Sequence, residues 1–306
     1  MDKLKQIQFT KFYKKMNIFS LILIFLSIFI LLFKGLNLGV DFKGGTLIEA
    51  RTESGAIDIS DIRQSLLKME LGDVTVKKFG KEYDYLIKIE VNNTSNTNFI
   101  KSLNDKLSSN LGSVINFRRV ENVGPKVSRE LLKSGMLAII FSLAAMLFYI
   151  WIRFEWQFSL GAILALIHDV LITMGIFSIL SFEINLSIIA AILTIVGYSM
   201  NDTVVIFDRI RENLKKYTTI SISEISNIST NETLSRTLIT SITTLLALFS
   251  IFIFGGAILK GFSFAMIAGV IVGTYSSIFV ATPILNYTNV SSKSVLKEDN
   301  ENEKKS

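Results

Sequence analysis

Long apolar runs alternate with short polar segments along most of the chain, and this pattern predicts membrane-spanning helices. Each run is largely uncharged and long enough to cross a bilayer, which takes about 20 residues. The six predicted spans cover residues 17–36, 134–152, 157–180, 186–206, 237–256 and 262–286. The segments outside them are 1–16, 207–236 and 287–306, and a longer one, 37–130, between the first two spans. The chain is therefore expected to be a polytopic α-helical membrane protein.

Residues 37–130 leave the membrane pattern and show the alternation of a soluble α+β domain. Asp58 and Ser60 are N-cap candidates for its first helix, and Gly80-Lys81 is a predicted turn between two strands. The predicted elements are strand Thr46–Arg51, helix Ile59–Met69, strands Val74–Phe79 and Tyr83–Val91, helix Phe99–Leu111 and strand Val114–Val120. This βαββαβ order predicts a split-βαβ, ferredoxin-like sandwich, a fold that does not specify a function.

Composition supports the membrane assignment and excludes several other classes. Half of the 306 residues are hydrophobic and the mean hydropathy is +0.47, which is typical of a polytopic membrane protein. The chain has no Cys and a single His, so disulfides and thiolate metal sites are excluded and a structural zinc site is disfavoured. The net charge of +6 fits basic loops on one side of a membrane, so it gives no support to nucleic-acid binding.

Lysine and arginine residues gather on one side of the predicted membrane. Basic residues precede the first span and follow the second, fourth and sixth, whereas the opposite short loops, 181–185 and 255–261, hold only Lys260. Both termini are therefore expected to be cytoplasmic, and 37–130 to face outward. A signal peptide is the alternative for the first run, but the run is long for one and no small-residue cleavage pattern follows Phe33.

Asp202 is the most informative residue because it places a carboxylate inside the cytoplasmic end of the otherwise apolar fourth span. An ionisable group in hydrocarbon is costly and typical of proton or ion traffic. Thr194, Tyr198 and Asp202 are four residues apart and Asn201 falls beside them, so they form one polar stripe that should face protein. The alternative is that Asp202 only packs helices together through hydrogen bonds.

The fifth span begins with a second polar stripe, formed by Arg236, Thr240, Thr243 and Thr244. Arg236 enters the membrane from the same side as Asp202 and at a similar depth, so the two can form a salt bridge. The alternative is that Arg236 anchors its helix by extending its guanidinium group to the lipid headgroups.

Two further motifs have less specific patterns. His168 and Asp169 lie near the middle of the third span, where a packing role and a proton relay are equal alternatives. The glycine-rich segment 39–46 lacks the Gly-Lys-Ser/Thr ending of a phosphate loop and opens onto no predicted helix. Its glycines are therefore assigned to a turn into the first strand, and 123–128 to the return turn before the second span.

Several motifs together cover nearly the whole chain. They are Gly39-Val40-Asp41-Phe42 with Gly44-Gly45, Val123-Gly124-Pro125, His168-Asp169-Val170, the string Gly197 to Asn213, Arg236-Thr237-Leu238-Ile239-Thr240-Ser241, and Gly255-Gly256 with Gly261-Phe262-Ser263. With these motifs the chain resembles the SecD/SecF family of bacterial protein-export accessory proteins, within the resistance-nodulation-division (RND) superfamily. The string Gly197 to Asn213 is the specific signal, and the glycine motifs alone are weak.

The resemblance implies a multi-pass protein of the bacterial inner membrane that pairs with SecD and associates with the SecYEG channel. YidC and YajC are further candidate partners. Such a complex would use the proton-motive force to move preproteins outward after the ATP-driven SecA stage, with no cofactor and no enzymatic activity. The resemblance also implies that Asp202 and Arg236 take part in proton conduction. Because RND proteins use two halves of six spans each, one unduplicated half would need a partner.

Two other functions compete with this interpretation. An RND-type exporter of small molecules or lipids would share the proton residues, but it would need a larger outer domain or a second half with a substrate path. An intramembrane aspartyl protease would pair Asp169 with Asp202. Their depths differ by about 10 Å at a rise of about 1.5 Å per residue, and the Tyr-Asp and Gly-x-Gly-Asp motifs of that family are absent from the sequence.

Overall fold

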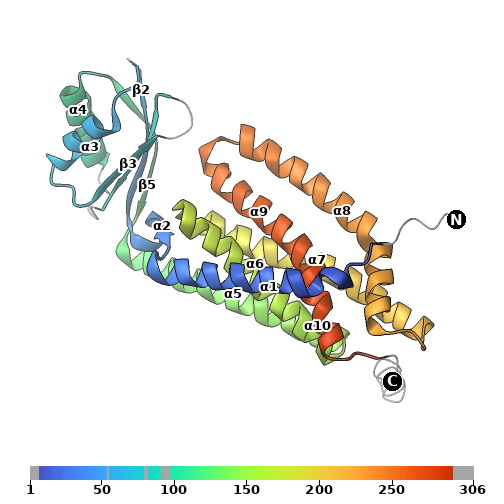
Figure 1. The fold of residues 1–306 in the computed structure, drawn as a ribbon. Coiled ribbons are helices and arrows are strands. Elements are labelled where there is room, and N and C mark those ends of the chain that lie inside the picture. The colour runs from blue at the N-terminus through green and yellow to red at the C-terminus, as the bar shows by residue number, and fades with distance from the viewer. Residues whose placement is uncertain (1–6, 54, 79–81, 91–96, 292–306) are drawn as a thin grey trace.

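The computed structural model describes residues 7–53, 55–78, 82–90 and 97–291, which form a bundle of long helices and a small α+β domain beyond one end of it (Figure 1). Within these residues, six helical segments are long and apolar enough to cross a membrane, which confirms the predicted fold class. They are α1 (Thr10–Phe33), α5 (Pro125–Arg153), α6 (Trp156–Leu180), α7 (Leu186–Lys216), α8 (Ile222–Phe254), and α9 (Gly256–Ser276) continued by the π-helical turn η1 (Ser277–Ala281) and α10 (Thr282–Tyr287).

Several helices extend well beyond the apolar runs that predict them. Segment 207–236, predicted as a loop, is mostly helical, because it holds the end of α7 and the beginning of α8. Hydropathy marks only the apolar part of a helix, whereas the polar ends carry other signals. Ser221, for example, caps α8 by accepting a hydrogen bond from the backbone N–H of Glu224. Pro125, predicted to lie in a turn, instead occupies the first turn of α5, where its missing N–H is not needed.

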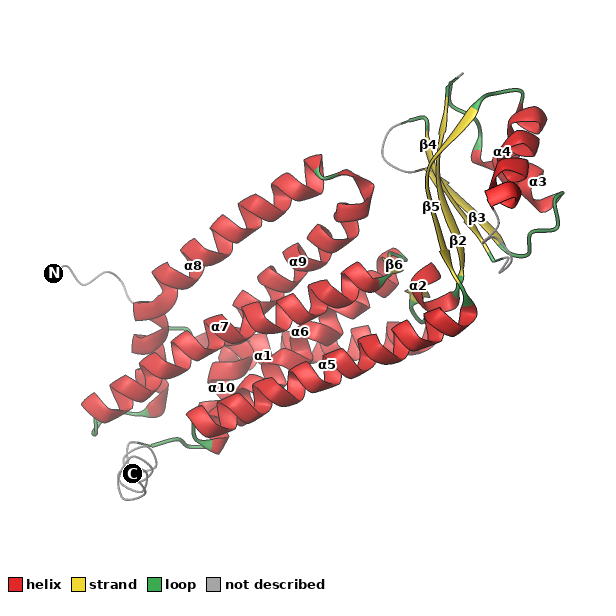
Figure 2. Cartoon of the chain, turned by 180° about the vertical axis from the view of Figure 1, so that it is seen from behind, coloured by secondary structure: helices red, strands yellow, loops and turns green. Residues whose placement is uncertain are grey.

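Helices α6, α7 and α9 form the centre of the bundle, with α1, α5 and α8 around them (Figure 2). Glycines allow close approach at two of these contacts. A Cβ atom added to Gly269 of α9 would lie 2.3 Å from Cγ1 of Ile195 on α7, and one on Gly175 of α6 would lie 2.4 Å from Oγ of Ser27 on α1. These glycines therefore let α7 pack closely on α9, and α1 on α6, as small residues permit in membranes.

The outer domain is the expected ferredoxin-like sandwich. Its elements are β2 (Gly45–Thr52), α3 (Ile59–Leu67), β3 (Val74–Lys78), β4 (Asp84–Ile89), α4 (Thr97–Leu111) and β5 (Ile115–Val123). The strands form one antiparallel sheet in the order β3-β4-β2-β5, and Ile48, Leu66, Ile87 and Leu107 belong to its buried core. Asp58 caps α3 as predicted, whereas the predicted turn at Gly80-Lys81 lies outside the described residues.

A junction that the sequence did not reveal joins the outer domain to the bundle. The two-residue strands β1 (Asn37–Leu38) and β6 (Glu183–Ile184) pair in parallel, so the chain leaving α1 contacts the loop between α6 and α7. Lys88 of β4 donates a hydrogen bond to the carbonyl of Leu38 (3.1 Å) and lies 3.9 Å from Oε1 of Glu183. The glycine-rich segment 39–46 is more than a turn, because it contains the short helix α2 (Val40–Lys43).

Gly45 begins β2 in a conformation that only glycine adopts easily. Its φ is +116°, and an added Cβ atom would lie 2.5 Å from the carbonyl oxygen of Ile89. This glycine therefore sets the close approach of β2 to β4 immediately above the junction.

Candidate functional site

Asp202 lies on α7 where this helix meets α8 and α9. Its residue surface is only 3% exposed. Thr274 of α9 interacts with the carboxylate and shares a 2.7 Å hydrogen bond with Ser241 of α8. Oδ2 of Asp202 has no hydrogen-bond partner among the described residues. A charged oxygen without a donor is costly in a buried site, so binding a proton would remove a cost that the ionised group carries here.

Arg236 lies on α8 and is exposed on the surface of the chain. Within the described residues it forms no ion pair with Asp202, so the salt bridge that the sequence suggested is not formed in this structure. Ion pairs at this end of the bundle include Arg153–Asp208, Arg209–Glu212, Arg209–Glu232 and Arg211–Glu155.

One hydrogen bond among the described residues joins the two polar stripes directly. The hydroxyl of Tyr198 on α7 donates to Oγ1 of Thr244 on α8 across 3.4 Å. Apart from the buried Asp202, the other stripe residues are exposed or form hydrogen bonds within their own helices. Thr194, Asn201 and Thr243 are exposed, and the hydroxyls of Thr194, Thr240 and Thr243 donate to carbonyls of Ala190, Thr237 and Ile239.

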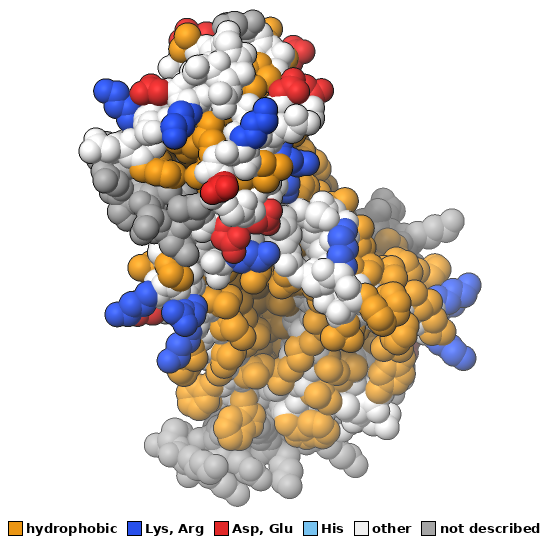
Figure 3. Space-filling view, turned by 90° about the vertical axis from the view of Figure 1, so that its left-hand side faces the viewer, with side chains coloured by type: hydrophobic (Ala, Val, Ile, Leu, Met, Phe, Trp, Pro, Cys, Tyr) orange, Lys and Arg blue, Asp and Glu red, His pale blue; other side chains and the backbone are white. Residues whose placement is uncertain are grey.

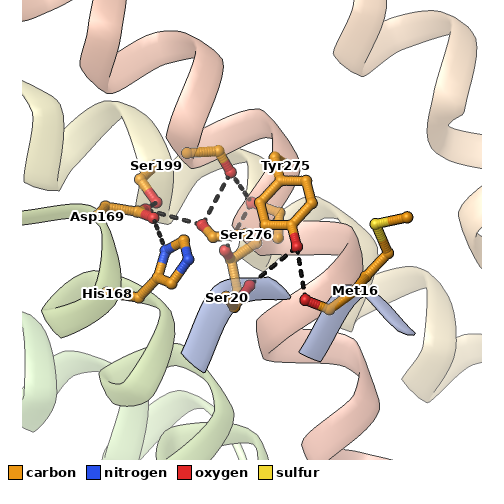
Figure 4. Close-up of polar contacts among 10 residues, drawn as sticks. Met16, Ser20, His168, Asp169, Ser199, Tyr275 and Ser276 are labelled. Atoms are coloured by element: carbon orange, nitrogen blue, oxygen red, sulfur yellow. Dashed lines mark hydrogen bonds and ion pairs between the residues drawn. The ribbon is translucent and has the colours of Figure 1, made fainter. Parts of the chain in front are cut away.

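His168 and Asp169 form a second, fully enclosed polar cluster (Figure 4). Nδ1 of His168 lies 2.8 Å from Oδ1 of Asp169. The other carboxylate oxygen accepts hydrogen bonds from Ser199 of α7 (2.5 Å) and Ser276 of α9 (2.8 Å). The His168 ring stacks on Tyr275 with centroids 6.0 Å apart. Asp169 of α6 is thus hydrogen-bonded to two other helices, α7 and α9. It shares no hydrogen-bond partner with Asp202 in the described part of the chain, unlike the paired aspartates of a protease.

Sequence reasoning missed the three hydroxyl residues that complete these clusters. Thr274 and Ser276 belong to α9, in which no polar stripe was identified. Ser199 lies within the string Gly197 to Asn213, and its hydrogen bond to Asp169 was not anticipated. Its position one helical turn before Asp202 is the signal that sequence analysis could have used.

The outer domain and the helical bundle differ in the side chains that they expose. Figure 3 shows charged side chains spread over the outer domain, whereas hydrophobic side chains cover most of the visible bundle. Exposed residues of this kind include Phe25, Leu32, Phe141 and Trp151, each more than 60% exposed. Such a surface is expected where a helix faces lipid.

Comparisons with known protein families agree with this architecture. The family model described as "Protein export membrane protein SecD/SecF, C-terminal" matches residues 103–291, and that of the "SecD/SecF GG Motif" matches residues 29–56. Proteins called "Protein translocase subunit SecF" from Rickettsia rickettsii and Rickettsia bellii are 47% and 46% identical to this chain. Each alignment covers 90% of the chain, and 90% and 91% of the respective relatives.

Two solved structures share the fold. One is SecDF from Thermus thermophilus, described as a translocon-associated membrane protein, with a TM-score of 0.84 and 33% identity over 95% of this chain. The other is SecDF in a super-membrane-facing form, with a TM-score of 0.69 and 32% identity over 99% of this chain. The present chain matches 40% of the length of each SecDF chain.

The fold and site define a multi-pass membrane protein of bacterial type, with a buried carboxylate among its central helices. The chain belongs to the SecD/SecF family of protein-export membrane proteins.

Proposed function

We propose that this chain works as the SecF-type subunit of a SecDF complex, which uses proton entry to promote preprotein movement across the cytoplasmic membrane. The observation that carries the proposal is the buried Asp202, one of whose oxygens has no partner among the described residues. A group of this kind changes its charge and its contacts when it takes up a proton. Each proton that enters along the membrane potential supplies about 2.3 kcal/mol per 100 mV.

Asp202 and Arg236 are the proposed proton-transfer residues. The ionised carboxylate attracts the Arg236 guanidinium, and protonation removes that attraction. Because the two residues lie on α7 and α8, this change alters the balance between two arrangements of these helices. Tyr198 and Thr244 bridge the same two helices, and Thr194, Asn201, Thr240 and Thr243 are proposed to support a hydrated path beside them.

A SecD-type half is the proposed partner for the exposed polar face of the bundle. Thr194, Asn201, Arg236 and Thr243 are exposed on this chain, although polar groups at membrane depth normally face protein or water. The match to only 40% of each SecDF chain is consistent with a second half that covers this face. Contacts with SecYEG, YidC and YajC, the absence of enzymatic activity and the cytoplasmic position of both termini are part of the same proposal.

Reconstitution tests the proposed function directly. Vesicles that contain SecYEG and SecA, with this chain and its SecD partner, should show preprotein movement that responds to an imposed proton gradient. Asp202→Asn keeps the shape of the side chain but cannot change its charge, so it should reduce this response to the level of vesicles without the complex. Asp208→Asn, which changes a half-buried carboxylate further along the same helix, is the matched control. Full proton-dependent activity in Asp202→Asn would exclude Asp202 from the mechanism.

A further inference from the structure

The cluster around Asp169 has the features of a structural cross-link between helices. His168 and Asp169 are fully buried, Ser199 is 1% exposed and Ser276 is fully buried. Both carboxylate oxygens of Asp169 already have hydrogen-bond partners, one from the histidine and two from the serines. Hydrogen bonds to a carboxylate are stronger than those between neutral groups. The arrangement is therefore suited to holding helices together.

The two serines connect Asp169 to α7 and α9, the two helices that carry Asp202 and Thr274. Ser199 precedes Asp202 by three residues on α7, so it lies about one turn away on the same side of the helix. Ser276 follows Thr274 by two residues on α9, and Thr274 is the residue that interacts with Asp202. Asp169 of α6 thus holds the two helices whose separation determines how Thr274 meets the Asp202 carboxylate.

The backbone around this cross-link has little freedom to adjust. A Cβ atom added to Gly273 of α9 would lie 3.0 Å from Cβ of Ser199, so α7 and α9 are already close at this level. Immediately after Ser276, the helix widens into the π-helical turn η1, and Thr203 of α7 and Ser277 of this turn share a 2.9 Å hydrogen bond. Single π-turns of this kind occur frequently at functional sites.

We propose that Asp169 is a positioning residue, which acts through Ser199 and Ser276 to hold Asp202 against Thr274. This inference rests on the proposed function, in which Asp202 transfers protons. Asp169 maintains the geometry of that site and does not itself carry the proton. His168 keeps the carboxylate in place through Oδ1, and its ring is supported by Tyr275, whose hydroxyl bonds to the carbonyl of Met16 on α1.

Two kinds of variant separate positioning from relay. Asp169→Asn removes the charged acceptor, whereas the double variant Ser199→Ala with Ser276→Ala keeps His168 and Asp169 but removes both links to the neighbouring helices. Positioning predicts that both variants lower proton flux of the reconstituted complex about ten- to a hundredfold, the range expected for a displaced reacting group. A relay through His168 and Asp169 predicts that the serine variant keeps nearly normal flux. That result would overturn the proposal.

An infrared measurement tests the geometry independently of transport. The band of the Asp202 carboxyl group, protonated or ionised, is assigned by its loss in Asp202→Asn. Asp169→Asn and the double serine variant should both shift this band, because the hydrogen bond between Asp202 and Thr274 changes. Ser263→Ala is the matched control, since Ser263 is a fully buried serine of α9 whose hydroxyl donates to carbonyls of its own helix.

The outcomes for the two proposals are distinct. An unshifted band in both variants, equal to that of Ser263→Ala, would disprove the positioning role even if Asp202 proves essential for export. Normal export by Asp202→Asn would disprove the proposed function, while a shifted band would still support the link from Asp169 to Asp202.

Discussion

The central and peripheral helices of the bundle differ in burial and in the chemistry of what they expose. About half or more of the most apolar stretch is buried in α6 (50%), α7 (50%) and α9–α10 (61%), compared with 11% in α1, 11% in α5 and 17% in α8. Yet α1 and α5 expose chiefly large apolar side chains, whereas α8 also exposes Arg236 and Thr243. Low burial alone therefore does not identify a lipid-facing helix. These exposed polar residues are the reason that α8, with the adjoining surface of α7, is proposed as the face for the SecD-type partner.

Among the substitutions considered, Arg236→Ala on the peripheral helix α8 should cause the largest loss of proton-dependent export. If the guanidinium acts together with Asp202, its removal leaves a buried carboxylate without its counter-charge, and proton-dependent export should fall to the level of Asp202→Asn. The double variant should then be no worse than either single variant, which a double-mutant cycle on proton flux measures. Arg236→Lys, which keeps the charge, is the control. Losses that simply multiply would instead support a lipid-anchoring role for Arg236.

Two Gly→Ala substitutions should distinguish the packed contact between α7 and α9 from the surface of α7 that is proposed to bind the partner. Gly269→Ala places a methyl group 2.3 Å from Ile195 and should destabilise the isolated chain by about 1–3 kcal/mol, as overpacking does. Gly197→Ala meets nothing within 4 Å, so the isolated chain should lose no stability and should gain up to about 1 kcal/mol from the better helix former. Thermal unfolding in detergent measures both. If α7 is covered by SecD near Gly197, this variant should still weaken copurification of the partner, and unchanged copurification would place the interface elsewhere.

Lys88→Met should give the smallest effect, at the junction outside the membrane. Burial lowers the pKa of the Lys88 ammonium group, and the nearby Glu183 opposes this shift. Because the pKa in the folded protein lies below the ordinary value of about 10.4, the folded state carries the charge at a cost. Stability should therefore rise as the pH increases from the lowered pKa to about 10.4. The rise should stay below about 1 kcal/mol, since the side chain is partly exposed.

The methionine variant should lack this rise, which thermal unfolding across the alkaline range measures. Lys78→Met, at an exposed position of the neighbouring strand β3, is the control and should keep it. The same pH dependence in Lys88→Met as in the unsubstituted protein would show that titration of Lys88 is not its cause.

Sequence patterns predicted the elements that depend on local periodicity. The apolar runs identified the six spans, and alternation identified the βαββαβ order, because each reflects burial along a single segment. The extension of α8 back to Ile222 was missed, because the first turns of this helix are polar and precede the apolar run on which the prediction rested. The site was only partly predicted. Asp202 is unusual in its own segment, whereas Ser199 and Ser276 gain their roles from Asp169, which is 30 and 107 residues away in the chain.

The paired strands β1 and β6 give α7 the properties of a lever. Asp202 lies 16 residues from Leu186, the outer end of α7, and this length corresponds to about 24 Å at a rise of about 1.5 Å per residue. A tilt of roughly 5° about Asp202 would displace that end by about 2 Å, enough to break a hydrogen bond. Because β6 directly precedes α7 and is bonded to β1, the strand leading into the outer domain would be pulled by the same displacement. A change of charge at Asp202 that barely moves α7 at that position would therefore displace the outer end of the helix, and with it the strand that leads into the outer domain.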